Sequence, residues 1–409
     1  MKTQFRKLGI VSVLAFSIFS CEKDAEHTVI DDNGLTDPTN TVVGPEHAIS
    51  GSYIIVFNAD KSLNGNKAAI QNKSAKIMNK YGIKSENQEF TYANAVQGFS
   101  VKNVSVKKAE LLKNDPDVAY IEPNYVTKLD YKILDSSNQL PVTEEQSKAV
   151  TNGGYLSSGD YEPWGIKRVG RSNGQGKTCW IIDSGIAPHN DLDIDTNRSR
   201  SFVRGENSWS DLNGHGTHVA GTVAAKMNGR GVVGVAHGAT VVAIKVLGAR
   251  GTGSDSGILA GVDYVMRNAR SGDTWNYSIG TRSRHISRAT DNAFRKLERQ
   301  VYGAMAAGNN NDDTQYYSPQ NLQTSRTWVV GNMTNRDRSN YDSSYGQSVD
   351  CWAPGTGVWS TWINGGYQKI SGTSMASPHV AGILLLRGNS IGRDGSVSKG
   401  GYTAPIATK

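Results

Sequence analysis

The chain has 409 residues, of which 37% are hydrophobic and 45 are glycine, and its formal net charge is +7. This length accommodates one large domain and one smaller domain, and the composition is typical of a loop-rich soluble enzyme rather than of a membrane protein. The basic residues are spread along the chain and form no run with interleaved aromatic residues, so we expect no nucleic-acid partner.

The N-terminus predicts export from the cytoplasm. Basic side chains precede an apolar stretch, residues 8–20, that is too short to span a bilayer, so residues 1–20 are predicted to be a signal peptide. The stretch ends Ile-Phe-Ser-Cys, which is similar to a bacterial lipoprotein processing site. We therefore expect a lipidated Cys21 and attachment to the outer membrane; ordinary signal cleavage nearby, followed by secretion, is the alternative.

Residues 21–50 are polar and without periodicity, which predicts a tether. From residue 51 to residue 128 strand and helix patterns alternate, and this β-α-β-α-β order predicts a small α+β, ferredoxin-like unit. Its expected strands are residues 53–57, 96–101 and 118–123, and its expected helices are residues 67–81 and 106–113. Residues 129–160 lack periodicity and are predicted to be a linker.

The remainder, residues 161–409, predicts an α/β domain with a doubly wound parallel sheet and a site at the carboxyl ends of its strands. The expected strands are residues 179–183, 240–246, 274–278, 301–306, 328–331 and 349–353, and the expected helices are residues 216–225, 256–268, 287–298 and a helix from residue 374 onward. Residues 387–409 turn quickly to Gly, Ser and Asp, so we expect no C-terminal domain.

Three segments of the larger domain carry chemistry. Asp183 ends an apolar strand before a glycine turn, and His215, flanked by glycines, opens an apolar helix. Ser374 follows a Gly-Thr turn where another apolar helix begins, among free backbone N–H groups that suit a nucleophile whose attack creates an oxyanion. Taken alone, such a serine is more often an ordinary N-cap residue.

In this chain order Asp183, His215 and Ser374 resemble the catalytic triad of the subtilisin-like serine proteases. The resemblance implies that Asp183 orients His215, that His215 is the general base, and that Ser374 forms the acyl-enzyme. Ala-Ala-Gly-Asn, residues 306–309, matches the family segment in which the asparagine, here Asn309, donates to the oxyanion. His218 and His379 also lie near these motifs, but a metal site is the weaker interpretation because the triad already uses His215.

The smaller unit contains the sequence motifs Gly-Phe-Ser and Asp-Pro-Asp-Val-Ala-Tyr-Ile-Glu-Pro, which resemble motifs of the inhibitor I9-type propeptide of these proteases. The resemblance implies a zymogen whose own propeptide guides folding and inhibits the enzyme. We expect Ser374 to cut the chain once between Lys128 and Trp164.

Substrate peptides are expected to bind by adding a strand to the enzyme. The family segments that border the substrate match Gly251, Thr252 and Gly253 on one side, Ser278, Ile279 and Gly280 on the other, and Ala307 and Gly308 near the S1 pocket. Residues 306–319 look most like the proteinase K branch, which implies an apolar or aromatic P1 residue and a cis Ser318–Pro319 bond. Asp255 at the rim predicts a basic or polar P4 residue.

The same branch implies a structural Ca²⁺ ion held by Asp350 and the backbone carbonyls of Ser325 and Thr327; the alternative is a surface aspartate. Cys179 and Cys351 are expected to be two separately buried free thiols, although an oxidising compartment would permit a disulfide.

These features together predict a monomeric serine endopeptidase with protein or peptide substrates, made as a self-processing zymogen. A catalytically inactive relative that acts as a scaffold is an alternative function. The presence of all three triad residues and of Asn309 argues against it. An acyl hydrolase acting mainly on esters is a second alternative, because the same machinery deacylates both kinds of substrate.

Overall fold

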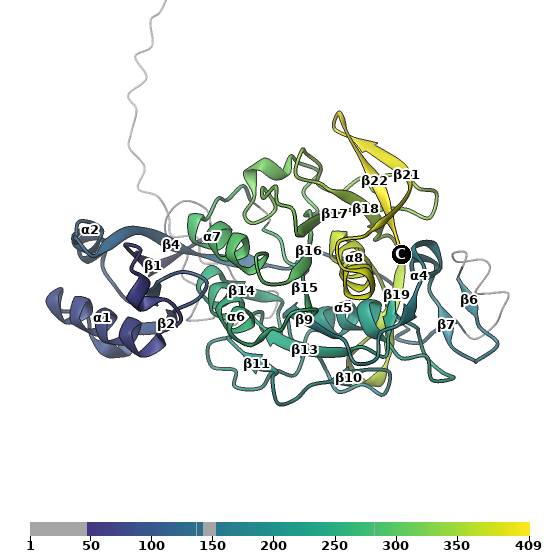
Figure 1. Cartoon of the computed structure of the whole chain (residues 1–409), viewed down its shortest axis with the longest axis horizontal. Helices are drawn as coiled ribbons and strands as arrows, with labels where there is room; N and C mark the ends of the chain where they lie inside the picture. The colour runs from purple at the N-terminus through teal and green to yellow at the C-terminus, as the bar shows by residue number, and fades with distance from the viewer. Residues whose placement is uncertain (1–46, 136, 142–152, 282) are drawn as a thin grey trace, which may run out of the picture.

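A computed structural model describes residues 47–135, 137–141, 153–281 and 283–409. They form two packed units: a small N-terminal unit, purple and blue at the left of Figure 1, and a larger unit that contains the C-terminus. The predicted signal peptide, Cys21 and nearly all of the predicted tether lie outside the described residues. No helix of the described part is both long and apolar enough to cross a bilayer.

The N-terminal unit is an antiparallel sheet covered by two helices. Its elements are β1 (Ala48–Phe57), α1 (Lys67–Lys80), β2 (Gln88–Tyr92), β3 (Gly98–Val101), α2 (Val106–Lys113) and β4 (Val118–Lys128), with the strand order β4-β1-β3-β2. Ile55, Phe57, Ile70, Phe99 and Leu112 lie in its core. The five predicted elements are present, but the observed order is β-α-β-β-α-β. The extra strand, β2, was missed since four of its five residues are only half-buried and show no alternation.

The larger unit is built on a parallel sheet. Its central strands are β9 (Thr178–Asp183), β13 (Thr240–Lys245), β15 (Thr274–Tyr277), β16 (Tyr302–Ala306), β17 (Thr327–Met333) and β18 (Cys351–Pro354). They lie in the order β13-β9-β15-β16-β17-β18, and the short β10 (Asp193–Ile194) and β11 (Arg200–Ser201) also pair with β13. All six predicted strands are confirmed, and their ends shift by one or two residues.

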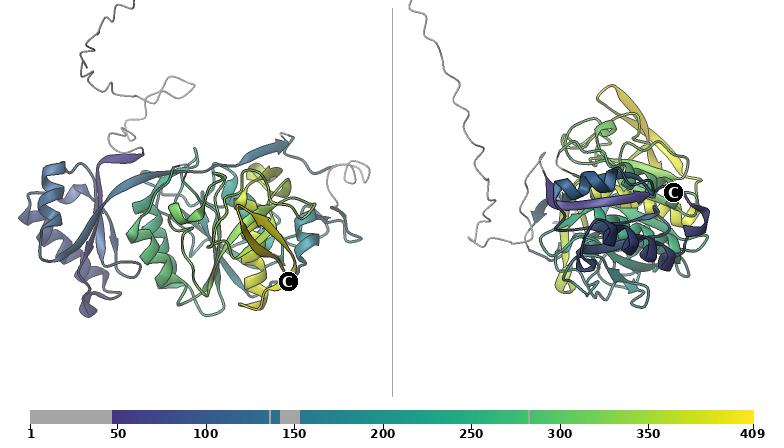
Figure 2. Two further views of the ribbon diagram at one scale, coloured as in Figure 1. Left: turned by 90° about the horizontal axis from the view of Figure 1, so that it is seen from above. Right: turned by 90° about the vertical axis from the view of Figure 1, so that its left-hand side faces the viewer.

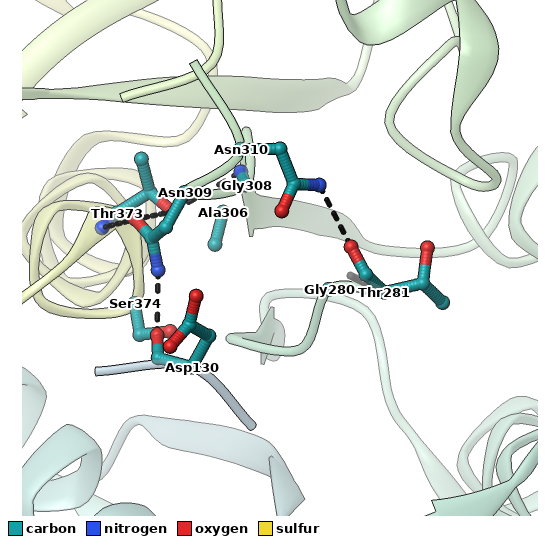
Figure 3. A pocket seen from close by; sticks show the side chains of 9 residues that line it. All are labelled: Asp130, Gly280, Thr281, Ala306, Gly308, Asn309, Asn310, Thr373 and Ser374. Carbon is teal, nitrogen blue, oxygen red and sulfur yellow. Dashed lines mark hydrogen bonds between the residues drawn. The ribbon is translucent and has the colours of Figure 1, made fainter. Parts of the chain in front are cut away.

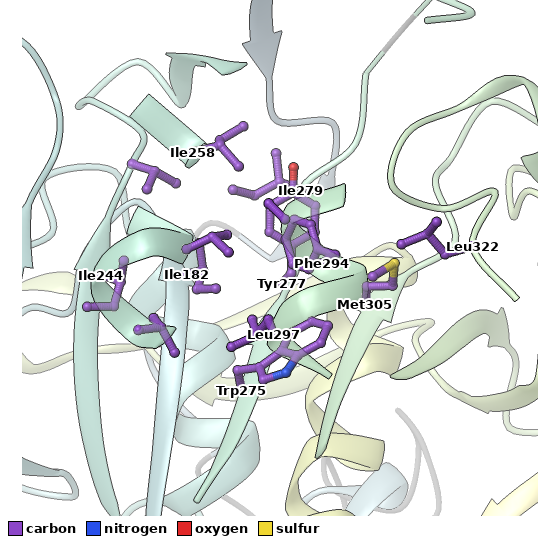
Figure 4. Packing of buried hydrophobic residues seen from close by; sticks show 14 of the residues in the cluster. Ile182, Ile244, Ile258, Trp275, Tyr277, Ile279, Phe294, Leu297, Met305 and Leu322 are labelled. Atoms are coloured by element: carbon purple, nitrogen blue, oxygen red, sulfur yellow. The ribbon is translucent and has the colours of Figure 1, made fainter. Parts of the chain in front are cut away.

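Helices cover both faces of this sheet (Figure 1). α5 (His215–Ala224) and α8 (Thr373–Arg387) pack on one face, and α6 (Asp255–Asn268) and α7 (Arg288–Leu297) pack on the other. Figure 4 shows the hydrophobic core between the sheet and α6 and α7. There the centroid of the Phe294 ring lies 5.2 Å from that of Trp275 and 4.9 Å from that of Tyr277. The predicted doubly wound architecture is therefore confirmed.

The C-terminal residues extend the sheet, which the sequence did not predict. β21 (Gly392–Lys399) and β22 (Tyr402–Thr408) form a hairpin, and β22 lies beside β18 with Ile406 opposite Trp352. Gly400 and Gly401 make the turn with φ angles of 60° and 85°. The strand pattern is hidden because most side chains of β21 are exposed, so the segment lacks a run of apolar residues.

Part of the predicted linker forms strands. β5 (Lys132–Asp135) pairs with β20 (Tyr367–Ser371), which in turn pairs with β19 (Val358–Thr361). The remaining short elements are β6 (Gly154–Tyr155), β7 (Tyr161–Glu162), α4 (Trp164–Val169), β8 (Ser172–Asn173), β12 (Ala236–His237), β14 (Thr252–Ser254) and the 3-10 turns Lys61–Leu63, Ser85–Asn87, Thr314–Tyr316 and Ile363–Gly365.

Two further predictions concern single residues, and both are confirmed. Cys179 and Cys351 are buried free thiols, and burial raises the pKa of the Cys179 thiol to about 12. The Ser318–Pro319 bond is cis.

Candidate active site

Asp183 and His215 meet where β9 ends and α5 begins. His215 Nδ1 lies 2.8 Å from Asp183 Oδ1, and both side chains are fully buried. A Cβ atom on Gly216 would lie 2.1 Å from the carbonyl oxygen of Gly185, so only glycine lets α5 approach the turn after Asp183 so closely. His215 Nε2 has no hydrogen-bond partner within the described residues.

Lys245, at the end of β13, supports this turn and was missed by the sequence analysis. Its side chain is fully buried, and its Nζ donates to the carbonyl oxygens of Ser184 (2.8 Å) and Leu247 (2.9 Å). The ammonium also lies 3.1 Å from a carboxylate oxygen of Glu206, which compensates its burial. The backbone directly after Asp183 is thereby fixed.

Ser374 is the second residue of α8 and lies at the carboxyl end of the sheet. Its Oγ donates to the carbonyl oxygen of Ser278 at 3.1 Å, and Ser278 Oγ donates to the Ser374 carbonyl at 2.9 Å. Ser374 is 5% exposed. The N-terminus of α8 is thereby tied to the end of β15, which pairs with β9, the strand that carries Asp183.

Asn309 follows β16 and is held by Thr373. Its Oδ1 accepts from the N–H (2.9 Å) and the hydroxyl (3.0 Å) of Thr373. With the oxygen so engaged, Nδ2 points the other way and donates to the carbonyl oxygen of Asp130 at 2.6 Å (Figure 3). The amide therefore presents a fixed donor to a backbone carbonyl beside Ser374.

The chain's own backbone occupies the groove at this point. β4 pairs antiparallel with β14, with Thr127 opposite Gly253 and Lys128 opposite Thr252, and the Leu129 N–H donates to the Gly251 carbonyl at 2.9 Å. The chain then passes Asn309 at Asp130 and pairs with β20 as β5. The expected strand 118–123 is thus extended to Lys128, because β14 supplies partners for its last residues. Residues 251–253 lie along this segment, and their role toward substrates stays a prediction.

Asp130 enters a small pocket of mainly polar and small residues. The pocket is lined by Asp130, Gly280, Thr281, Ala306, Gly308, Asn309, Asn310, Thr373 and Ser374 (Figure 3). Of the residues predicted for this side, Gly280 and Gly308 line the pocket, whereas Ala307 lies in the hydrophobic core and Ile279 accepts from Gln320 Nε2 at 2.8 Å. The residue that the chain itself places here is an aspartate, not the apolar or aromatic residue that the resemblance implied.

Asp255 is paired beneath the bound strand, and the residue that it contacts there is polar: Thr127, three positions before Asp130. Asp255 is 5% exposed, its Oδ2 lies 2.9 Å from His285 Nε2, and its Oδ1 lies 3.4 Å from the Thr127 hydroxyl. Tyr125 of β4 packs over the His285 ring with 4.0 Å between the centroids. The carboxylate is thus covered by β4 and His285. The expected basic or polar P4 residue stays a prediction.

Two carboxylates anchor the N-terminal unit on α6 and α7, and sequence reasoning identified neither role. Asp263 Oδ1 accepts the backbone N–H groups of Ala93 (2.8 Å), Asn94 (2.6 Å) and Ala95 (2.9 Å). Glu122 of β4 accepts from the Ser287 hydroxyl (2.9 Å) and the Ala289 N–H (3.2 Å) at the start of α7. Burial raises the pKa of the Glu122 carboxyl, although these hydrogen bonds oppose the shift.

A third polar anchor joins β4 to α6. Asn124 of β4 accepts from the Ser256 N–H at 3.0 Å and donates to the Ser256 hydroxyl at 2.9 Å.

The residues proposed to bind a metal lie at the starts of two neighbouring strands: Ser325 and Thr327 at β17, and Asp350 directly before β18. Asp350 accepts the Val329 N–H at 2.8 Å, and burial raises the pKa of its carboxyl to about 7. The Ser325 carbonyl accepts from Asn389 Nδ2 at 3.0 Å, and the Thr327 carbonyl lies 3.4 Å from the Thr324 hydroxyl. Among the described residues, no three His, Cys, Asp or Glu side chains gather as a ligand set.

Comparison with known proteins decides the family. Residues 174–389 match the model of the Subtilase family, and residues 52–130 match the model of Peptidase inhibitor I9. The chain belongs to the subtilase family. It is a subtilisin-like serine endopeptidase, and the I9 propeptide makes it a zymogen. The I9 match ends at Asp130, the residue whose carbonyl Asn309 contacts.

Several curated subtilases are similar to this chain over most of its length. "Alkaline serine exoprotease A" of Vibrio alginolyticus is 33% identical over 86% of this chain, and the chain spans 63% of that protein's length. "Subtilisin-like serine protease AsES" of Sarocladium strictum is 36% identical over 71% of this chain and 70% of its own length. "Proteinase R" of Parengyodontium album is 30% identical over 85% of this chain and 82% of its own length, in keeping with the proteinase K-like branch.

Proposed function

We propose that Asp183, His215, Ser374 and Asn309 hydrolyse peptide bonds and that this subtilase first cuts its own Asp130–Tyr131 bond. One observation carries the proposal: Asn309 Nδ2 donates to the Asp130 carbonyl oxygen at 2.6 Å, beside Ser374. An amide donor at that distance suits the oxyanion that forms when this carbonyl is attacked. The paired strands on both sides of the bond hold it in place.

The chemistry follows from the positions of the side chains. Ser374 Oγ turns from the Ser278 carbonyl toward His215 Nε2, which takes its proton while Oγ attacks the Asp130 carbonyl carbon. Asp183, 2.8 Å from His215 Nδ1, stabilises the imidazolium and keeps the ring oriented. His215 then gives the proton to the Tyr131 nitrogen as the peptide bond breaks, and water hydrolyses the acyl-enzyme at Asp130.

The two rival functions are separated by one set of assays on the purified mature enzyme. A fluorophosphonate probe should label the mature parent at Ser374, identified by mass spectrometry of the labelled peptide, and should leave the uncut Ser374→Ala precursor unlabelled. An inactive scaffold would remain unlabelled in both forms. Casein and a small ester should then both be hydrolysed. Ester hydrolysis without any casein cleavage would overturn the assignment as an endopeptidase.

We also propose that a structural Ca²⁺ ion binds Asp350 and the carbonyls of Ser325 and Thr327. The residues fit a hard cation because the carboxylate is largely buried with one backbone N–H donor, and a bound cation would offset its burial cost. The Ser374→Ala precursor, which cannot digest itself, should melt at a higher temperature in Ca²⁺ than in a chelator. The same melting temperature in both conditions, or an equal rise in Asp350→Asn, would contradict this site.

The place of action is proposed from the N-terminal sequence. The apolar residues 8–20 and Cys21 favour export and lipidation, and they lie outside the described residues. Mass spectrometry of the protein from a bacterial membrane fraction should find an acylated Cys21. A soluble extracellular product cleaved elsewhere would favour simple secretion.

A further inference from the structure

Tyr131, the residue after the proposed cut, lies in an aromatic environment. Its ring centroid is 5.0 Å from that of His215 and 6.5 Å from that of Trp362, which it meets edge to face at 69°. Its hydroxyl lies 3.3 Å from Asn213 Oδ1. Trp362 itself is 6% exposed, so its ring is a buried, well-packed side of the site.

Lys132, the next residue, meets a charge of opposite sign. Its ammonium pairs with the Asp342 carboxylate, and the backbone register sets Lys132 opposite Ser371 at the end of β20. Hydrogen bonding to Asp342 raises the pKa of Lys132. Further along β5, Ile133 and Leu134 are 53% and 52% exposed. Lys132 is exposed as well, and its ion pair with Asp342 is what distinguishes it from these two residues.

We propose that the groove beyond the scissile bond is a specificity site that selects an aromatic residue at P1′ and a basic residue at P2′. Trp362 is the specificity residue for P1′, and Asp342 is the specificity residue for P2′. The substrates are then polypeptides that carry such a pair after the cut bond. This inference rests on the proposed function, in which Tyr131 and Lys132 take the P1′ and P2′ positions.

The two contacts are expected to differ in strength. An aromatic ring packed between His215 and Trp362 gains both burial and ring contact, so a P1′ tyrosine should be cut about tenfold faster than alanine. The Lys132–Asp342 pair is exposed, with 67% and 33% of the two side chains accessible, so the P2′ preference should be about fivefold at most.

The test uses the mature enzyme and short quenched peptides, because these lack the linker that tethers Tyr131 in the precursor. All peptides carry Thr-Lys-Leu-Asp before the cut, followed by Tyr-Lys, Phe-Lys, Ala-Lys or Tyr-Glu. We expect kcat/KM for Tyr-Lys and Phe-Lys to agree within about threefold, since the hydroxyl contact is long, and both to exceed Ala-Lys by about tenfold. Equal rates for Tyr-Lys and Ala-Lys at the same Asp–Xaa bond would overturn the inference.

Two variants locate the effect. Trp362→Leu should bring the Tyr-Lys to Ala-Lys ratio close to one, and Asp342→Lys should invert the Tyr-Lys to Tyr-Glu ratio. Asp394→Asn removes an exposed carboxylate of β21 that pairs with Arg168, and should leave both ratios unchanged. Ratios that survive Trp362→Leu and Asp342→Lys would refute the site even if the parent has the preference.

The peptide series alone decides the P1′ preference if Trp362→Leu does not fold. Failure of the proposed function looks different from failure of this inference. A mature enzyme that cuts none of the peptides, or cuts them at another bond, contradicts the proposed function; cleavage at the Asp–Xaa bond without discrimination contradicts only the specificity site.

Discussion

The two sides of the Asp130–Tyr131 bond are held in contrasting ways. On the propeptide side, buried polar groups of both units meet: Asp263 accepts three backbone N–H groups, and Asn124 bonds Ser256 in both directions. On the other side, β5 pairs with β20 through its backbone, but the side chains of Lys132, Ile133 and Leu134 are largely exposed. Figure 2 shows the chain leaving the N-terminal unit and running along one side of the protease.

The two kinds of contact predict how firmly each segment stays bound after the cut. Buried, fully paired polar contacts are lost at a high cost, whereas exposed pairs contribute little. We therefore expect the propeptide to remain bound after the cut, as an inhibitor, and the segment that begins at Tyr131 to exchange readily. Changes on the propeptide side should alter the retention of the propeptide, and changes beyond the bond should alter the cleavage rate without altering that retention.

The largest effect on the cleavage rate is expected at the scissile bond itself, where Asn309 contacts the Asp130 carbonyl. Asn309→Ala removes the donor to the Asp130 carbonyl, and loss of such a donor lowers kcat about 10²–10³-fold in subtilisin. Self-cleavage after refolding, followed on gels over time, should slow by a similar factor.

Asn310→Ala is the matched control for that variant. The Asn310 amide donates to the Thr281 carbonyl at 2.7 Å and lines the same pocket. Its loss should change the rate of self-cleavage by less than about threefold, because no oxyanion donor is removed. An equal slowing in both variants would mean that the loop after β16, and not the Asn309 donor, is responsible.

A large effect on retention is expected for Asp263→Ala. The substitution leaves the N–H groups of Ala93, Asn94 and Ala95 without their acceptor, which should weaken the bound propeptide by about 3 kcal/mol, or about a hundredfold in its dissociation constant. Size-exclusion chromatography of the cut complex over a dilution series measures this constant. Asp117→Asn, an exposed carboxylate paired with Lys73 inside the propeptide, is the control and should behave like the parent.

A smaller effect is expected from pH. Burial raises the pKa of Glu122 in the complex, so its contribution is fully present below the usual carboxyl pKa and is lost as the pH rises through the raised value. Propeptide retention should therefore weaken as the pH is raised across that window, and Glu122→Gln should flatten the dependence. A slope in Glu122→Gln as steep as in the parent would assign the effect to other groups.

The smallest effect is expected beyond the scissile bond. Asn138 accepts from Gln368 Nε2 at 2.7 Å through its side chain, and its carbonyl accepts the Tyr367 N–H at 3.1 Å. Because the residue is exposed, Asn138→Ala should slow self-cleavage by less than about threefold and leave propeptide retention unchanged. A loss of retention as large as that of Asp263→Ala would erase the contrast between the two sides.

The fold was accessible from the sequence because it depends on local patterns: β9 is an apolar run that ends at Asp183, and an apolar helix begins beside Ser374. The roles of the reacting residues came from their resemblance to the subtilase triad, since each motif alone is a weak signal. The hairpin β21–β22 was missed because the side chains of β21 are mostly exposed and because β22 pairs with β18, a partner distant in the chain.

The scissile bond and its anchors depend on contacts between distant segments. Asp130 meets Asn309 across 179 positions, and Asp263 meets Ala93 across 170, and neither partner carries a local signal of the other. The pairing of Asp255 with His285 was missed for the same reason. The position of Asp255 beside the groove was read from the chain, but its partner His285 lies 30 residues away on another loop.

The most direct test of the account is the N-terminus of the cut product. The parent and Ser374→Ala should be produced in a host that lacks other proteases, and the mass and first residues of each fragment determined. The parent should yield a propeptide ending at Asp130 and a protease beginning at Tyr131, while Ser374→Ala should remain one uncut chain. A parent protease that begins at another residue, or a Ser374→Ala chain cut at the Asp130–Tyr131 bond, would contradict this prediction.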